Sequence, residues 1–269
     1  YMLSAQLSYD ITDWLNISGR VRVDNTHTKY EQKLYASSNL TITEESTQGH
    51  YTISKPDETQ TYADVLANIN KRFNDFSLVA NVGASIVNNR YEDLSYRGPI
   101  REKGIPNVFN VFDLDNTKKK ARQDEWQEQT QSVFASVEVG WKSMLYLTLT
   151  GRNDWASQLA NSSTPCFFYP SVGLSGVISE MLTLPEFIDY MKVRGSFSSV
   201  GMPYPRNLTS PTYEYDEANQ QWKPKTHYPI KDLKPERTNS WELGLDMRLF
   251  KDFSLGFSWY LANTFNQTF

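Results

Sequence analysis

The sequence predicts an all-β protein, an antiparallel transmembrane β-barrel segment of about ten strands in five hairpins. Three observations support this prediction. Apolar and polar residues alternate along most of the chain, the links between alternating segments are short at one end and long at the other, and aromatic residues cluster beside the short links. Strict alternation is typical of strands because successive side chains of a strand point to opposite faces.

The alternating segments form five pairs along the chain. In order, these pairs are 3–9 with 15–23, 63–69 with 76–86, 133–141 with 145–149, 172–178 with 191–197, and 241–249 with 253–259. The last pair shows the pattern most clearly, since Trp241 and Leu243 alternate with Glu242. Residues 180–191 could hold a helical turn, and Pro185 limits its length.

The links between these segments differ in length at the two ends of the strands. Short links are expected at 10–14, 72–75, 142–144 and 250–252, and long links at about 26–60, 88–125, 156–168 and 200–238. Short turns on one side and long, polar loops on the other are typical of outer-membrane barrels. Aromatic residues beside the short turns, such as Trp14, Trp141 and Phe250, suit the interface between bilayer and water.

The composition argues against several classes of protein. The net charge of −4 argues against nucleic acid as a partner, and the single Cys166 excludes an internal disulfide. No segment approaches the roughly 20 apolar residues of a membrane helix, but a membrane-spanning strand needs only about 9–11 residues. A soluble β-sandwich is the structural alternative, with the apolar face as its core; its strands commonly have about 5–6 residues, and the alternating runs here are longer.

Motifs of enzymes and metal sites are weak in this sequence. None of His27, His50 and His227 has a neighbouring acid or cysteine at the spacing of a metal motif. The segment GLSG at 173–176 is not a nucleophile elbow, and no phosphate-binding glycine motif occurs. We therefore expect a protein that is not an enzyme, with no metal and no cofactor; a hydrolase that uses free carboxylates is the alternative.

Four longer segments resemble a known family. They are LTLTGRNDWASQL (147–159), FFYPSVGLSGVISEM (167–181), YMKVRGSFSSVGMP (190–203) and DLKPERTNSWELGLDMRLFKDFSLGFSWYLANTFNQ (232–267). In order and spacing they resemble the SusC/RagA-type TonB-dependent outer-membrane transporters. The resemblance is strong from Gln131 onward and weaker in the loop-rich first half.

The resemblance implies a particular place for the chain in a longer protein. Such transporters have a TonB box, a plug domain and a 22-stranded barrel, so residues 1–269 are expected to be one partial β-barrel domain in which plug, TonB box and final strands are absent. Because ten strands leave two unpaired edges, we expect other protein to supply the missing strands.

The resemblance also implies a function and a set of partners. It implies active import of an oligosaccharide, less often a peptide, across the bacterial outer membrane. A SusD-like surface lipoprotein would cap the outer mouth, outer-membrane lipid would surround the barrel, and the TonB complex would act through the missing plug. The alternatives are a passive porin or receptor barrel, or a soluble carbohydrate-binding β-domain.

Charged residues occupy the polar positions of the predicted strands. On the lipid side near the bilayer centre each would cost about 2–4 kcal/mol, so they are expected to face the lumen and the plug. These residues are Arg20, Arg22, Arg194, Glu242, Asp246 and Arg248. The simpler role for them is hydration of the barrel wall and ion pairs between neighbouring strands, and the more specific role is contact with the plug.

The long links carry the candidate substrate-binding residues. Arg152, Asn153, Asp154 and Trp155 are expected at the outer end of a strand, and Tyr213, Tyr215, Trp222 and Tyr228 in the link at 200–238. Aromatic rings stack on the C–H faces of a sugar while amide and acid groups bind its hydroxyls, and a peptide would suit the same residues. The alternative is a self-packed surface loop.

Overall fold

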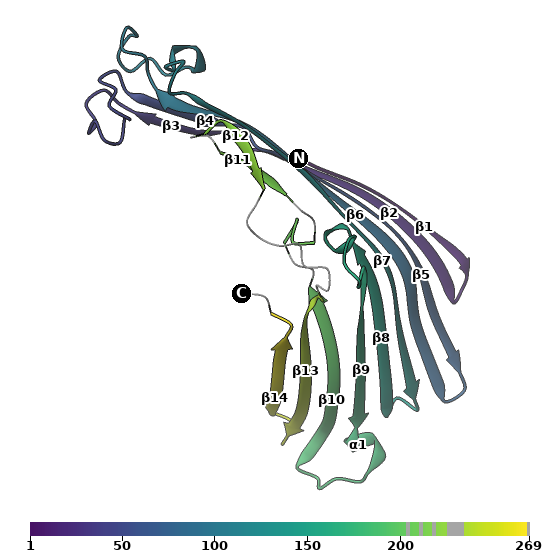
Figure 1. Ribbon diagram of the computed structural model, residues 1–269. Helices are drawn as coiled ribbons and strands as arrows, with labels where there is room; N and C mark the ends of the chain where they lie inside the picture. The colour runs from purple at the N-terminus through teal and green to yellow at the C-terminus, as the bar shows by residue number, and fades with distance from the viewer. Residues whose placement is uncertain (203–204, 210–211, 217–218, 225–233, 268–269) are drawn as a thin grey trace. The chain divides into compact units, whose positions relative to one another are not determined.

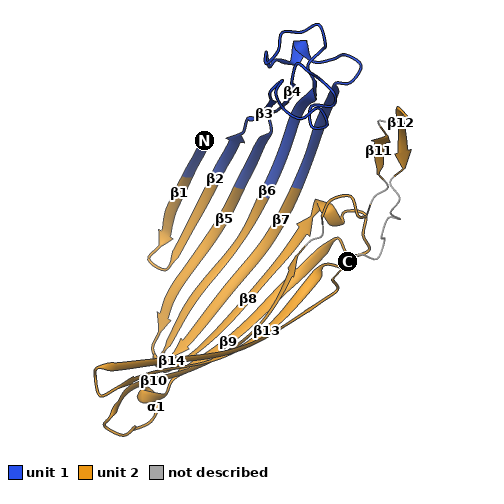
Figure 2. Cartoon of the chain, turned by 90° about the vertical axis from the view of Figure 1, so that its left-hand side faces the viewer, with its two compact units in different colours: residues 1–5, 21–62, 87–128 blue, residues 6–20, 63–86, 129–269 orange. Residues whose placement is uncertain are grey.

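The computed structural model describes residues 1–202, 205–209, 212–216, 219–224 and 234–267. The chain divides into two compact units, shown in different colours in Figure 2. Unit 1 comprises residues 1–5, 21–62 and 87–128, and unit 2 comprises residues 6–20, 63–86 and 129–269. Several long strands pass from one unit into the other, so each unit contains parts of the same sheet.

Ten strands form the main path of one sheet, and their order in the sheet is their order in the chain (Figure 1). They are β1 (Met2–Thr12), β2 (Leu15–His27), β5 (Asp57–Phe73), β6 (Phe76–Pro99), β7 (Lys120–Trp141), β8 (Leu145–Ala156), β9 (Cys166–Val177), β10 (Ile188–Met202), β13 (Glu236–Leu249) and β14 (Phe253–Phe265). The all-β class and the ten strands in five hairpins are therefore confirmed. Within the described residues, β1 and β14 end this order, so the sheet does not close.

Two tight turns show how the short links reverse the chain. Lys142 and Ser143, and likewise Phe250 and Lys251, all have positive φ values between 52° and 63°. The amide of Met144 donates to the carbonyl of Trp141 at 2.9 Å. Two successive positive φ values are typical of the type I′ turn, whose twist matches that of the flanking strands. The predicted short links at 142–144 and 250–252 are thus tight hairpin turns.

The long links are shorter than the sequence predicts, because strands continue into them. The ends of the links expected at 26–60 and 88–125 belong instead to β5, β6 and β7. Of these strands, β6 has 24 residues. At about 3.3 Å per residue such a strand far exceeds the 9–11 residues that cross a bilayer. The outer halves of these strands have two polar faces, so they lack the alternation on which the prediction depended.

Shorter elements complete the structure. In the first long link, β3 (Tyr30–Leu34) pairs with β4 (His50–Ser54), and β4 also pairs with β6; β11 (Tyr213–Asp216) and β12 (Gln221–Pro224) form a separate hairpin. Short 3₁₀ helices lie at Val111–Asp113 and Ser157–Leu159, and α1 is Ile178–Met181. Within the described ranges, no helix has the length and apolar character needed to cross a membrane.

The apolar face of the sheet is exposed rather than packed in a core. Trp241, Leu243 and Phe257 keep 53%, 56% and 64% of their surface accessible. In unit 2, a small cluster of buried apolar residues forms around Leu159 and Phe167, at the end of the sheet opposite the tight turns. A β-sandwich would cover such a face with a second sheet, so these exposures favour a face that contacts lipid.

Candidate functional site

A cluster of charged residues lies on the polar face of β10, β13 and β14. The guanidinium of Arg194 donates to Asp246 Oδ2 at 3.0 Å, to Glu242 Oε1 at 3.2 Å and to Ser258 Oγ at 2.8 Å. Three strands thus contribute to one network around a single cation. The structure brings together three of the six residues predicted to face the lumen, Arg194, Glu242 and Asp246.

Gly244 explains how one arginine reaches both acids. It pairs directly with Arg194 in the register of β10 and β13, between Glu242 and Asp246. A Cβ atom at position 244 would lie 2.7 Å from Arg194 Cγ, so the glycine leaves the space in which the arginine side chain lies across β13. The sequence contains this glycine, but its role depends on a pairing register that alternation alone does not predict.

The other predicted lumen residues lie elsewhere on the sheet. In unit 2, Arg20 on β2 forms an ion pair of 2.7 Å with Asp64 on β5. In unit 1, Arg22 forms an ion pair of 2.7 Å with Asp24 and donates to Gln60. Arg248 is exposed near the tight turn after β13 and is paired in register with Tyr190 and Ser254.

The four predicted residues of the RNDW segment lie within β8 and do not converge. Arg152 Nε donates to Asp154 Oδ1 at 2.7 Å, and the hydroxyl of Tyr169 donates to Asp154 Oδ2 at 3.1 Å. Asp154 is only 7% exposed, and Arg152 also donates to Ser132. Both carboxylate oxygens of Asp154 therefore already accept hydrogen bonds from the protein.

Asn153 and Trp155 point to the opposite face of β8, because neighbouring residues of a strand alternate. Trp155 is paired with Cys166 and is 43% exposed. It lines an open pocket of about 440 Å³ together with Gln129, Gln131 and Ser157. An aromatic ring beside two amide side chains could bind a polar ligand, but Arg152 and Asp154 do not take part in this pocket.

The predicted aromatic residues of the last long link share one face of the β11–β12 hairpin. Tyr215 pairs directly with Trp222, and their ring centroids are 5.3 Å apart in an edge-to-face arrangement. Tyr213, two residues before Tyr215, lies on the same face, and the three rings are 49–69% exposed. Tyr228, the fourth predicted residue, lies outside the described residues.

Charged residues occupy the other face of this hairpin. Glu214 pairs in register with Lys223, and Lys223 forms an ion pair with Asp216. The hairpin therefore presents an aromatic surface, Tyr213, Tyr215 and Trp222, backed by a charged one. Rings that are exposed on one surface can stack against the C–H face of a ligand.

Unit 1 contains a second kind of polar site, at β3 and β4. The hydroxyl of Tyr51 donates to Glu31 Oε1 at 2.6 Å. Burial and this hydrogen bond raise the pKa of Tyr51 to about 12, and the same bond lowers the pKa of Glu31. His50 is 6% exposed, its burial lowers its pKa, and its Nε2 lies 3.5 Å from Glu44.

No group of three or more His, Cys, Asp or Glu side chains that could hold a metal ion occurs in the described part of the chain. Sequence reasoning missed Tyr169, Ser132 and Ser258 as partners of the charged residues. Ser132 and Tyr169 pair in register with Asp154 and Arg152 on the two strands beside β8. Ser258 pairs with Gly244 on β13 and is reached by Arg194 from one strand farther away, so its role depends on the register of β10 with β13 as well as on the tight turn before β14.

Comparison with known proteins identifies the family. Residues 1–268 match the family described as TonB dependent receptor-like, beta-barrel. No curated protein sequence matches the chain.

Solved structures show the same fold. A structure of the RagAB peptide transporter matches with a TM-score of 0.81 at 15% identity, covering 98% of this chain and 30% of that chain. The siderophore receptor PiuA from Acinetobacter baumannii matches with a TM-score of 0.56 at 14% identity, covering 96% of this chain and 39% of that chain. The ferric-catecholate import receptor Fiu from E. coli K12 matches with a TM-score of 0.57 at 11% identity, covering 98% of this chain and 40% of that chain.

The present chain spans about 30% of the RagAB chain, so it corresponds to part of a barrel. At these identities the likeness establishes the fold, and the family match covers nearly the whole sequence. The predicted TonB-dependent β-barrel and its outer-membrane location are confirmed, and the fold is that of the RagAB transporter chain. The chain is an outer-membrane β-barrel segment that belongs to the TonB-dependent receptor-like β-barrel family.

Proposed function

We propose that the full-length protein imports an oligosaccharide across the outer membrane, driven by TonB, with a SusD-like lipoprotein at its outer mouth. The observation that supports an oligosaccharide is the aromatic surface of the β11–β12 hairpin, Tyr213, Tyr215 and Trp222. Sugar rings present C–H faces that stack on such side chains, and their hydroxyls bind polar groups nearby. A peptide is the alternative cargo, because peptide side chains can occupy the same surface.

The polar face of the strands supports TonB-dependent transport rather than a passive pore. In this proposal the Arg194 cluster and the residues Arg20, Arg22 and Arg248 face the lumen, where a plug domain contacts them. Arg194 contacts two acids, and Lys192 pairs in register with one of them, Asp246, so this part of the polar face offers charges of both signs that a plug could complement. A passive porin or an uncoupled receptor would need no such contact.

The soluble carbohydrate-binding domain is the weakest alternative. Such a domain would bury its apolar face, whereas Leu243 and Phe257 are more than half exposed on the apolar face of β13 and β14. A soluble protein seldom exposes so large a contiguous apolar surface.

Transport by the full-length protein with its partner lipoprotein tests the proposal. Cells that express the complex should accumulate a labelled oligosaccharide, and accumulation should stop when TonB is deleted while surface binding persists. Accumulation without TonB would establish a passive pore. Uptake of labelled peptides and not of oligosaccharides would replace the proposed cargo with the alternative.

Trp222→Ala tests the aromatic surface. A stacked ring contributes about 0.5–1.5 kcal/mol, so binding of the oligosaccharide should weaken by about 2- to 10-fold. Glu214→Ala, on the charged face of the same hairpin, is the matched control and should bind as the unmodified protein does. Equal affinities of the two variants would exclude this surface as the binding site.

A further inference from the structure

A groove that the import function does not use runs from the middle of β9, β10, β13 and β14 to their outer ends. Its lower part is a dimple in the apolar face, of about 400 Å³. Gly195 lies at its centre, paired with Leu174 on β9 and with Leu243 on β13, and Leu243 pairs with Trp259 on β14. A row of four apolar positions thus has one missing side chain, which leaves a space bounded by apolar residues.

The apolar face ends abruptly above this dimple. Phe197 pairs with Trp241, and two residues farther along the strands Ser199 pairs with Asn239, which pairs with Asn263. The hydroxyl of Ser199 donates to Asn239 Oδ1 at 2.7 Å. Because residues 241–249 supply the roughly nine residues that span the hydrocarbon, this polar row lies at the level of the lipid headgroups.

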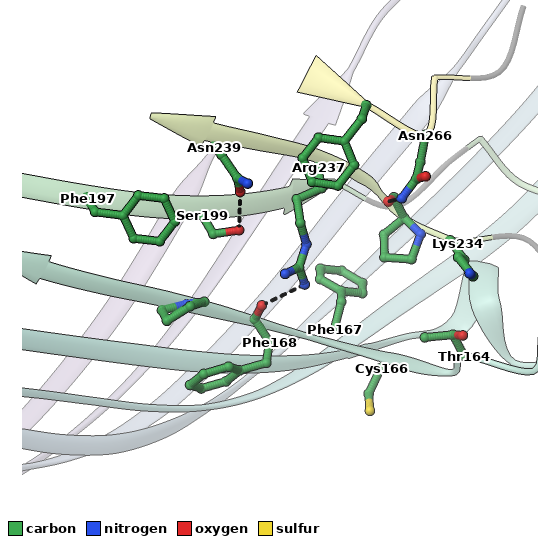
Figure 3. A pocket seen from close by; sticks show the side chains of 13 residues that line it. Thr164, Cys166, Phe167, Phe168, Phe197, Ser199, Lys234, Arg237, Asn239 and Asn266 are labelled. Carbon is green, nitrogen blue, oxygen red and sulfur yellow. Dashed lines mark hydrogen bonds between the residues drawn. The ribbon is translucent and has the colours of Figure 1, made fainter. Parts of the chain in front are cut away.

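A second pocket, of about 550 Å³, opens at this polar row (Figure 3). It shares Phe197 with the dimple, so the two form one groove. Its walls are aromatic, with Phe168 and Phe265, and its polar groups include Arg237 and Lys234. No carboxylate is among the described residues that line it, so its charge is positive.

Pro170 accounts for the opening between β9 and β10. The described pairing of these strands ends at Ser171 and Ser198, whereas β9 stays paired with β8 as far as Cys166. Proline has no amide hydrogen and therefore cannot continue a ladder. The carbonyl of Phe168 instead accepts a hydrogen bond of 3.1 Å from Arg237, which holds the guanidinium in the pocket (Figure 3).

We propose that this groove binds one phosphate-bearing membrane lipid from the leaflet nearer the long loops. An acyl chain fills the dimple at Gly195, and the phosphate contacts Arg237 and Lys234. The aromatic rings between them, Phe197 above all, contact the upper part of the chain. The positive charge at headgroup depth matches the phosphate of such a lipid, and the apolar space at hydrocarbon depth matches its acyl chain. A neutral lipid matches only the apolar space.

Lipid binding to the full-length protein tests this proposal. The protein is purified in detergent, stripped of lipid and titrated with dioleoyl phosphatidic acid, dioleoylglycerol or inorganic phosphate while native mass spectra are recorded. One phosphatidic acid should bind per chain, at least tenfold more tightly than dioleoylglycerol or inorganic phosphate. Equal binding of phosphatidic acid and dioleoylglycerol, or no bound lipid, would overturn the proposal.

Two variants separate the ends of the groove. Arg237→Gln with Lys234→Gln should remove the preference for phosphatidic acid, whereas Lys251→Gln, in the tight turn between β13 and β14, should keep it. Gly195→Leu fills the dimple and should weaken the binding of both lipids at least tenfold. Ala135→Leu places the same side chain on the apolar face of β7 and should weaken the binding of neither.

Folding of each variant is verified by its resistance to unfolding in SDS. Lys234→Gln alone leaves the hydrogen bond of Arg237 intact and should give a partial loss of preference. If both charge variants keep the full preference for phosphatidic acid, the proposed headgroup site is wrong.

Discussion

Two regions of the molecule differ in whether their apolar side chains are buried or exposed. In unit 1, the segments around β4 and the loop after β6 bury Ile100 and Leu114 to about 1% exposure, and Ser46 Oγ donates to the carbonyl of Ile100 at 2.8 Å. In unit 2, Trp241 and Phe257 stay more than half exposed, and the ion pairs of Arg194 lie on the opposite face. The first region is organised as a small protein core in water, and the second as a wall between lipid and a wet interior.

This contrast shows that the alternation of apolar and polar residues along a strand depends on what its two faces contact. Where one face meets lipid and the other water, alternation is strict, because a charge on the wrong face is costly. Where both faces meet water, as in the outer halves of β6 and β7, alternation is lost although the strand continues. The following substitutions test the contrast, from the largest expected effect to the smallest.

The largest effect is expected for Leu149→Arg on the apolar face of β8. An arginine near the bilayer midplane should lower the free energy of unfolding by about 2–4 kcal/mol. Thr148→Arg is the matched control, because its neighbour Glu138 lies on the polar face and can pair with the new charge. Denaturant unfolding of the full-length protein in lipid vesicles measures both variants. Equal losses would mean that the two faces do not differ in their surroundings.

A smaller effect is expected for Gly244→Ala in the charged cluster. The added methyl group would displace Arg194 from its place between Glu242 and Asp246, which should cost about 1–3 kcal/mol. Gly173→Ala provides the control, because the nearest atoms to its added methyl lie 3.8 Å away or more. The same unfolding experiment compares them. If Gly244→Ala is as stable as Gly173→Ala, the cluster does not depend on the glycine.

The smallest effect is a pH dependence in unit 1. Burial lowers the pKa of His50 in the folded state, so the neutral form is favoured there, although Glu44 acts in the opposite direction. Stability from this residue is therefore present above the unfolded pKa of about 6.5 and is lost as the pH falls through the lower folded value.

Hydrogen exchange of residues 50–54 measures this effect in the full-length protein. Protection, corrected for the intrinsic pH dependence of exchange, should decrease between pH 7.5 and pH 5. In the variant His50→Gln, which cannot titrate, the corrected protection should stay constant over this range. A decrease of the same size in both proteins would show that another group is responsible.

The sequence predicted the membrane-facing parts of the fold well and the outer parts poorly. The apolar faces of β13 and β14 could be predicted because every second residue of a strand that faces lipid must be apolar. The pairs β3–β4 and β11–β12 were not predicted, since each strand has only four or five residues, too few for alternation to distinguish a strand from a loop.

The candidate site shows the same division. That Arg194, Glu242 and Asp246 lie on the polar face follows from alternation, but their convergence depends on the register that places Gly244 opposite Arg194. The RNDW segment was expected at the outer end of a strand, and it forms the last part of β8, which ends at Ala156. Alternation then separates Asp154 from Trp155, a consequence that the sequence already contained.

Fluorescence quenching on β8 tests the central claim most directly. In full-length protein with Cys166 replaced by Ser, single cysteines at Leu147, Thr148, Leu149 and Thr150 are labelled and quenched by brominated lipid or by iodide in water. We predict that lipid quenches the labels at 147 and 149 and that iodide quenches those at 148 and 150. Quenching without this alternation, or with the two sets exchanged, would contradict a sheet that separates bilayer from aqueous interior.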